Sequence, residues 1–371
     1  MKNTPILTLV LLLGCNVLLA QPAQIRGKIS DVTTGKGIAS VHIFPINNQQ
    51  NGTISNADGL FILNLRKPTD TLIVSHVSYN TKAIPTQKGK TIYKVHLTPL
   101  QHTLSEIVVK PVTAEEIVSR AIKRIKKNHN VHPVYYQFYT RIISFSHDST
   151  LHFFEEHTGA MFIKKGFFFD YTKIRPEKSR FRYLTDIGKK RFENQYMVSM
   201  TAMIWDDLYR NNNEYLGHYG NTFYEYSFKS SASILNRPCY VVAFETEQKT
   251  YYKSGLLYID KETYAIAREV VGSEDGSIRV VTFKALDGKW YLKSARDLAY
   301  GKFVNEQRTT LYNLIDEPEN SDDFVKVEEL LPIKVDQLAD DFNDNYWEDR
   351  NIVPLPGWIE KALKKKWRKS D

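Results

Sequence analysis

Short runs of alternating apolar and polar residues, each closed by a turn signal, fill most of this chain. Between residues 24 and 98 the runs are short, and turn residues recur about every ten positions, as in small sandwiches. From 135 to 314 the runs are longer and rich in Tyr and Phe, of which the whole chain has 22 and 19. Both residue types are favoured in strands. The pattern predicts a mainly β protein: a small N-terminal β-sandwich, then a larger curved antiparallel sheet or half-barrel with few helices.

Six separated pieces of the first part keep the order seen in a known module. They are Ile25–Ile29, Thr34–Ala39, Val41–Ile43, Gly52–Thr53, Asp58–Phe61 and Val74–Tyr79. In this order they resemble the carboxypeptidase-like regulatory domain over residues 24–110. The resemblance implies a transthyretin-like β-sandwich that is a non-catalytic module, common at the front of exported proteins of Bacteroidetes-type bacteria.

The segment Asn56-Ala57-Asp58-Gly59 could be part of a metal-binding loop or a hairpin turn. An EF-hand loop with Asn56 third and Asp58 fifth would need oxygen ligands at its first and twelfth positions. Those positions hold Ile54 and Leu65, which cannot bind calcium. We therefore interpret the segment as a turn in which Gly59 takes a positive φ and Asp58 bonds the turn backbone.

The N-terminus carries an export signal. Lys2 precedes an apolar run from Ile6 to Ala20, too short to span a membrane, with the small Ala20 at the expected cleavage point. Leu12-Leu13-Gly14-Cys15 also resembles a bacterial lipobox, and cleavage before Cys15 would leave a lipid anchor. We favour the plain signal peptide at residues 1–20, because the apolar run continues past Cys15, and we expect a periplasmic or outer-membrane-associated protein.

One helix is expected near residue 113. Thr113 can cap it with Glu116 as the partner in a capping box, and Ile117, Ala121 and Ile125 form an apolar stripe. The net charge of +8 includes a basic cluster at the helix exit, at Lys123, Arg124, Lys126 and Lys127. We interpret these cations as the solvated end of a packed helix and not as a nucleic-acid patch, so no nucleic-acid partner is expected.

The rest of the chain, residues 111–371, is predicted to be one mainly antiparallel β domain. Its strand patterns are Tyr136–Ile142, Leu151–His157, Thr222–Phe228, Cys239–Glu245, Gly255–Ile259, Ala265–Val271, Ile278–Ala285, Trp290–Tyr300 and Phe303–Tyr312; residues 199–209 are predicted to be helical. Tyr136–Arg141, Leu257–Ile266 and Tyr346–Ile352 resemble a Bacteroidetes family in which the same sandwich precedes a domain of unknown function. The hairpin at Leu257–Ile266 is also similar to the half-barrels of lipoprotein carriers such as LolA.

Few residues suggest chemistry. His152 and Glu155 have a zinc-site spacing, but residues three apart in a strand point to opposite faces. Cys239 begins an apolar strand and is interpreted as a buried structural thiol. His129 and His132 flank a helix end and are expected to be solvated. We predict no catalytic, cofactor-binding or metal-binding residues, and no cofactor.

The C-terminal segment from Trp358 to Lys369 is a short helix candidate, with Ile359, Leu363 and Trp367 spaced by four among basic residues. It could lie on an anionic membrane surface, but we favour a docked terminal helix. The leading hypothesis is a non-enzymatic envelope protein that binds a lipid, an extended ligand or an outer-membrane protein partner. The rivals are a glycan or peptide hydrolase with two unidentified carboxylates and a structural accessory subunit of an outer-membrane complex.

Overall fold

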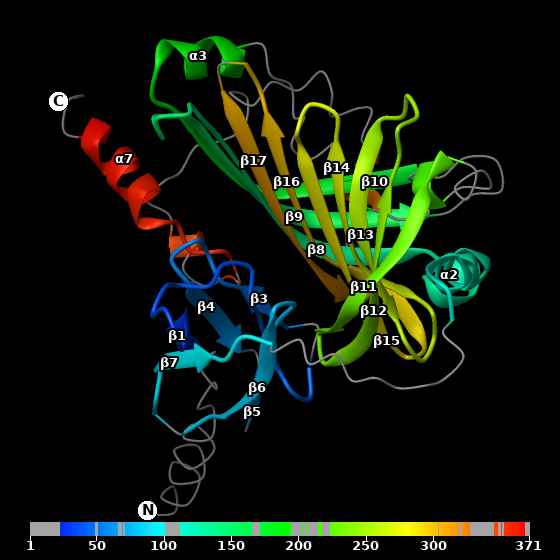
Figure 1. Cartoon of the computed structure of the whole chain (residues 1–371). Coiled ribbons are helices and arrows are strands. Elements are labelled where there is room, and N and C mark those ends of the chain that lie inside the picture. The colour runs from blue at the N-terminus through cyan, green and yellow to red at the C-terminus, as the bar shows by residue number, and fades with distance from the viewer. Residues whose placement is uncertain are drawn as a thin grey trace, which may run out of the picture.

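The computed structural model describes residues 23–48, 51–65, 69, 71–87, 89–100, 112–164, 171–193, 203, 206, 214–216, 223–302, 304–318, 321–326, 345–347, 350 and 352–367. A small group of N-terminal strands lies against a large curved sheet, and the C-terminal helix lies beside both (Figure 1). The protein is mainly β, which confirms the predicted fold class.

The N-terminal strands form a sandwich of two sheets, with strand orders β4-β1-β7 and β3-β2-β5-β6. The bounds are β1 Ala23–Asp31, β2 His42–Pro45, β3 Thr53–Ile54, β4 Leu60–Leu65, β5 Thr71–His76, β6 Tyr79–Pro85 and β7 Ile92–Leu97. Apolar side chains of both sheets share one core, which includes Ile29, Val41, Ile43, Leu63 and Leu97. Strand β6 was not recognisable from the sequence, because this edge strand exposes most of its side chains and has no apolar alternation.

The large sheet has 11 strands in the order β11-β12-β13-β14-β15-β16-β17-β8-β9-β10-β18. The bounds are β8 Val134–Phe145, β9 Leu151–Lys164, β10 Tyr171–Tyr183, β11 Glu225–Ile234, β12 Arg237–Glu245, β13 Tyr252–Asp260, β14 Ile266–Ser273, β15 Ile278–Leu286, β16 Lys289–Tyr300, β17 Asn305–Ile315 and β18 Val325–Lys326. Neighbouring strands are antiparallel throughout. Within the described residues β11 and β18 are unpaired edges, so the sheet is open.

Strand β10 is the long strand that the sequence pattern did not reveal. Charged residues occupy much of Tyr171–Tyr183, and Pro176 stands at a register shift against β9. A proline at a bulge and a run of charges hide the apolar alternation by which strands are usually recognised.

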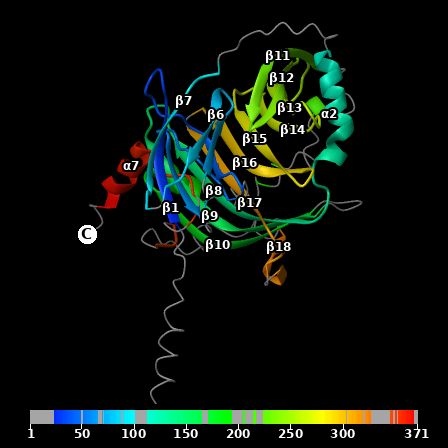
Figure 2. The same ribbon diagram turned by 90° about the horizontal axis from the view of Figure 1, so that it is seen from below.

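The two faces of the large sheet are covered by different parts of the chain. Side chains alternate between the faces, so Phe283 and Lys284 point in opposite directions. The face that carries Phe283, here called the helix face, packs against helix α2 (Ala114–Asn128) and against the described residues 203 and 214–216. The opposite face, here called the sandwich face, packs against β2 and β5. Figure 2 shows α2 and the sandwich on opposite sides of β14–β16.

Helix α2 begins as predicted, since Glu116 N donates to Thr113 Oγ1 at 3.2 Å. Ile117, Val118 and Ala121 are buried against the helix face. The prediction for His129 was wrong: the side chain is only 3% exposed. His129 follows the last residue of α2 and forms a β-bridge with Trp290 of β16. Its ring lies edge-on to the ring of Phe283, with 5.0 Å between the ring centroids. His132, three residues further along the chain, is exposed as predicted.

The chain ends in a strap and a helix. Residues 352–356, here called the strap, lead into α7 (Gly357–Trp367). Ile359 and Leu363 are buried against Ile143, Leu151 and Phe154, as a docked terminal helix requires. The side chains of residues 364–367 lie outside the described residues, as do residues 368–371. The remaining helical elements are α3 Asp186–Glu193 and the short 3₁₀ turns Glu214–Leu216, Ser321–Asp323 and Asn345–Trp347.

Several predictions fall on parts of the chain that the structure does not describe. They concern the signal peptide with Cys15, residues 101–111, and the helix expected at 199–209, of which only Met203 and Asp206 are described. In the described part, no helix is both long and apolar enough to cross a membrane.

Candidate ligand-binding site

The turn at Asn56–Gly59 is structural, as expected, but its hydrogen bonds differ from the prediction. Asn56 Oδ1, not Asp58, accepts from the turn backbone, at 2.9 Å from Asp58 N and 2.8 Å from Leu60 N. Gly59 has φ 77°. The Asp58 carboxylate points out of the turn and accepts from Gly357 N at 2.9 Å. The turn therefore serves to hold α7.

The zinc-like pair does not converge. His152 Nδ1 lies 2.7 Å from Thr185 Oγ1, whereas Glu155 hydrogen-bonds to His157 on the other face of β9. Among the described residues no cluster of three or more His, Cys, Asp or Glu is placed to hold a metal ion. Cys239 is buried, and burial raises the pKa of its thiol to about 12. The thiol therefore stays protonated and unreactive at neutral pH.

A serine, a histidine and a glutamate on β9 and β10 form a hydrogen-bonded series of the kind found in hydrolases. Ser179 Oγ lies 2.6 Å from His157 Nδ1, and His157 Nε2 contacts Glu155. The sequence did not suggest this series, because Ser179 comes from the unrecognised strand β10. The exposed fractions of Ser179 and His157 are 5% and 0%, so a substrate cannot reach the hydroxyl in this structure. The arrangement is that of a buried polar network and not of an accessible catalytic site.

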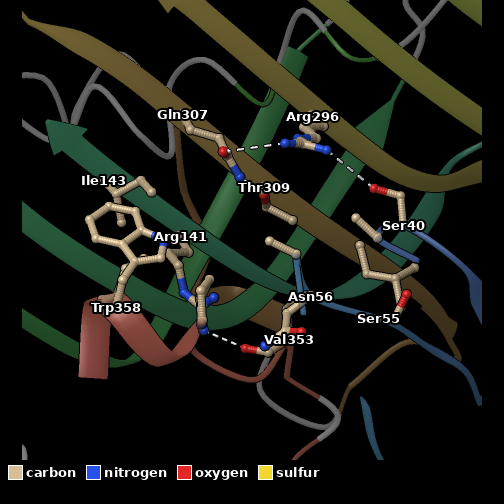
Figure 3. A pocket seen from close by; sticks show the side chains of 15 residues that line it. Ser40, Ser55, Asn56, Arg141, Ile143, Arg296, Gln307, Thr309, Val353 and Trp358 are labelled. Carbon is tan, nitrogen blue, oxygen red and sulfur yellow. Dashed lines mark hydrogen bonds between the residues drawn. The ribbon is translucent and has the colours of Figure 1, made fainter. Parts of the chain in front are cut away.

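A pocket opens where the sandwich, the large sheet and the strap meet, and is here called the seam pocket. Its volume is about 80 Å³, several times the roughly 10–15 Å³ that one water needs. The sandwich, the large sheet and the C-terminal segment all contribute to its wall. The lining residues are Ala39, Ser40, Ile54, Ser55, Asn56, Ala57, Arg141, Ile143, Arg296, Gln307, Thr309, Val353, Pro356, Trp358 and Ile359 (Figure 3).

The charge of Arg141, one of the two arginines in the pocket, is neutralised. Its Nε lies 2.5 Å from Glu156 Oε1, and Arg180 Nε lies 2.5 Å from Glu156 Oε2. The Arg141 guanidinium also donates to the carbonyl oxygens of Val353 and Pro354. Despite burial, which opposes the carboxylate, the two arginines hold the pKa of Glu156 below its usual value. Arg141 therefore anchors the strap.

Arg296, the second arginine, has only neutral partners. It donates to Ser40 Oγ at 3.4 Å and to Gln307 Oε1 at 3.3 Å, and no carboxylate of the described residues pairs with it. Burial lowers the pKa of Arg296, although a guanidinium stays charged in proteins. Ser40 is held at φ 58°, a left-handed conformation that places its hydroxyl beside Arg296. Figure 3 shows Arg296 between Gln307 and Ser40.

The other side of the seam pocket is largely apolar. Trp358 and Ile359 at the start of α7 face Ile143 of β8, and Ile54 and Val353 complete the wall. The pocket thus combines one uncompensated cation with a short apolar surface, which is the pattern of a site for a small amphiphilic anion.

The sandwich face next to the pocket carries further cations. The further cations are Lys284 of β15, Lys293 of β16 and Arg268 of β14, all covered by the sandwich. His42 of β2 lies on the sandwich side of the same contact. The sequence did not mark these residues as unusual, because lysine and arginine in a strand are usually solvated. Only the docking of a second layer onto this face buries them.

The sequence of the sandwich matches the model of a known domain family. Residues 25–109 match the sequence model of the CarboxypepD_reg-like domain. The resemblance inferred from the six separated pieces is thereby confirmed for this stretch. No curated protein matches the chain.

Some solved structures are similar to part of this chain. A DUF1329 family protein from Desulfovibrio piger is 12% identical, over 57% of this chain and 95% of that one, with a TM-score of 0.31. A LolA superfamily protein from Nitrosomonas europaea is 12% identical, over 56% of this chain and 96% of that one, with a TM-score of 0.24. Values this low are no basis for transferring a ligand or an activity.

Proposed function

We propose that this protein is exported and acts in the cell envelope as a non-enzymatic binding module that holds a carboxylate group in the seam pocket. The observation that carries the proposal is Arg296, a partly buried cation that lines a pocket of about 80 Å³ and has no carboxylate partner among the described residues. A partly desolvated charge is costly unless it is paired. A bound carboxylate would supply the missing partner.

The geometry suits a carboxylate with a short aliphatic portion. A guanidinium can bind both oxygens of a carboxylate at once, which gives strength and orientation. The hydroxyls of Ser40 and Thr309 lie in the same pocket as further polar contacts. Ile143 and Trp358 offer apolar contact to the carbon chain. A free short-chain acid and the C-terminus of a polypeptide share this chemistry, so an outer-membrane protein partner could present the group.

Binding is favoured over catalysis by the composition of the pocket. The 15 described lining residues include no Asp, Glu, His or Cys. General acid–base or thiol chemistry requires such side chains within hydrogen-bond reach of the ligand. The other serine in the wall is Ser55, whose hydroxyl donates a hydrogen bond to Ile38 O and accepts one from Val41 N.

Within the described residues, the seam is favoured over the helix face of the large sheet as the place where a ligand binds. On the helix face, Met203, Tyr215 and Leu216 are buried together with Ile117 and Val118 of α2. The pocket beside the end of α2, lined by His129, Tyr136 and Phe283 among others, measures about 20 Å³. That volume holds about one water and no acyl chain.

Isothermal titration with propionate and with its neutral isostere propionamide tests the proposal. The protein is expected to bind propionate in the millimolar to high-micromolar range, below the ceiling of about −7.5 kcal/mol for five heavy atoms, which corresponds to a Kd of a few micromolar. Propionamide is expected to bind at least about tenfold more weakly, because it lacks the charge that pairs with Arg296. N-acetylalanine and N-acetylalaninamide form the corresponding pair for a chain end.

Arg296→Met removes the charge and keeps much of the side-chain volume, so it is expected to abolish the preference for the acid. Lys229→Met is the matched control, since Lys229 is an exposed cation on β11 and lies outside the pocket lining. Circular dichroism checks that both variants are folded. Equal affinity for propionate in the protein and in Arg296→Met, or no binding at all, would refute the proposal.

A further inference from the structure

The contact between the sandwich and the large sheet buries groups that can gain protons. His42 of β2 is 6% exposed, Lys284 of β15 is 1% exposed and Lys293 of β16 is 2% exposed. Gly52 of the sandwich lies directly over this contact: a Cβ at this position would stand 3.1 Å from Lys293 Nζ. Phe44 and Ile73 of the sandwich join the apolar cluster of the large sheet at the same place.

Among the described residues, the charged groups that act on His42 and Lys284 have the same sign. Those that act on His42 are Lys293, Arg268 of β14 and His76 of β5. Lys284 faces Lys293, and Arg268 faces Arg296. Lys293 donates to the neutral amide of Asn313 at 3.3 Å. Lys284 Nζ and His42 Nδ1 have no hydrogen-bond partner within the described part of the chain.

Protonation of the His and Lys side chains in this contact is unfavourable, because they are buried and their charged neighbours are cations. Burial lowers the pKa of Lys284 to about 6, of Lys293 to about 8 and of His76 to about 4, and it lowers the pKa of His42 well below its usual value. Each value lies below that of the solvated group. The stability contributed by each group is present above its solvated pKa and is lost as the pH falls through the lower one. Acidification therefore weakens the contact progressively.

We propose that acid releases the sandwich from the large sheet, through protonation of His42, His76 and Lys284 at their contact, and so opens the seam pocket. The release concerns the docked layers and stands apart from the proposed function; only its effect on ligand binding rests on that function. Protonated groups of one sign repel one another in a low-dielectric contact, and separating the layers admits water to all of them.

The strap keeps the released sandwich attached. Asn56 Nδ2 donates to Leu355 O at 3.1 Å, and Thr53 Oγ1 lies 3.4 Å from Ile352 O. These bonds join neutral groups, which do not titrate. The sandwich is therefore expected to rotate about the strap while the two cores, which are separate clusters, remain folded.

Distance measurement between two spin labels tests the release. Lys94→Cys on β7 and Glu274→Cys at the β14–β15 turn place labels on exposed positions, in a Cys239→Ala background without ligand. At about pH 8 the distances between the two labels are expected to fall in one narrow distribution. The fraction of molecules with longer and more broadly distributed distances is expected to grow about tenfold by about pH 4.5 and to disappear when the pH is returned to about 8. Circular dichroism over the same range is expected to stay unchanged.

A variant that cannot gain these protons separates the mechanism from general acid effects. His42→Asn, His76→Asn and Lys284→Met together are expected to keep the single narrow distance in acid. His132→Asn with Lys229→Met, both exposed positions, is the matched control and should open like the parent. An unchanged distance in the parent at acid pH, equal opening of the triple variant, or unfolding of both parts at one pH would overturn the inference. Propionate binding at about pH 8 reports on the proposed function alone.

Discussion

Asp58 Oδ2 accepts a hydrogen bond from Gly357 N at 2.9 Å, across 299 positions of sequence. Gly357 is the first residue of α7, so a carboxylate from the sandwich caps a helix at the other end of the chain. A negative charge at a helix N-terminus satisfies an orphan N–H and complements the helix dipole. The sandwich and the C-terminal helix are thereby joined at one corner of the seam.

Asp58→Ala is expected to loosen α7 without unfolding the sandwich. Loss of a capping interaction typically costs about 1–2 kcal/mol. Amide exchange in α7 should then accelerate by about 5- to 30-fold, as hydrogen–deuterium exchange would measure. Glu247→Ala, at an exposed position, is the control. Unchanged exchange in α7 would show that Asp58 does not hold the helix.

Asp206→Ala is expected to be severely destabilising. Its carboxylate is fully buried and pairs with Arg308 at 2.6 and 2.8 Å and with Arg279 at 2.9 Å on the helix face. Removal leaves two buried guanidinium groups short of counter-charge, which typically costs about 3–5 kcal/mol. Urea unfolding measures the loss. A loss below about 1 kcal/mol would mean that water enters and solvates the arginines.

Glu269→Gln is expected to stabilise the protein in alkaline but not in acidic solution. Burial raises the pKa of Glu269 to about 7, above its unfolded value of 4.5. The contribution of the protonated form is therefore present below the unfolded pKa and is lost as the pH rises through about 7. Gln retains a group that can meet Tyr215 Oη, which lies 2.9 Å from the carboxylate. Thermal melts of the two proteins should diverge between about pH 4.5 and pH 7 and run parallel above that range; curves that stay parallel throughout would contradict the shift.

Cys239 is expected to resist thiol reagents while the protein is folded. Its side chain is buried and the pKa of the thiol is raised to about 12, so almost no thiolate exists at neutral pH. Ellman's reagent should react with it only in denaturant. Rapid labelling of the native protein at about pH 8 would show that β12 opens on the timescale of the assay.

Strands with an apolar face were predictable, and those without one were not. Leu60–Leu65 alternates cleanly between buried and more exposed side chains, which is the pattern from which the sandwich was predicted. Tyr79–Pro85 exposes its side chains, and Tyr171–Tyr183 is interrupted by Pro176 and by charges. Both were missed for the same physical reason: pattern reading detects the burial of apolar side chains and not the pairing of backbones.

The seam could not be predicted, because it is made by contacts between layers. Arg296 and Lys284 look like ordinary strand residues until the sandwich covers them. Local sequence does record some of the supporting detail, such as the cap at Thr113 and the turn at Gly59. It does not record which face of the large sheet receives the sandwich, or that Asp58 would meet Gly357 and not a metal ion.

The pairing of β17 with β8 sets an order for folding. Strands β11 to β17 join neighbours in sequence, as do β8 to β10, so each group can assemble through short hairpin loops. The two groups unite only when Asn305–Ile315 finds Tyr135–Phe145. Closing so long a loop carries a large entropic cost and is slow compared with hairpin formation. The pairing of β17 with β8 should therefore be a late step in folding. Until it occurs, each group of strands has an unpaired edge through which copies of the chain could associate.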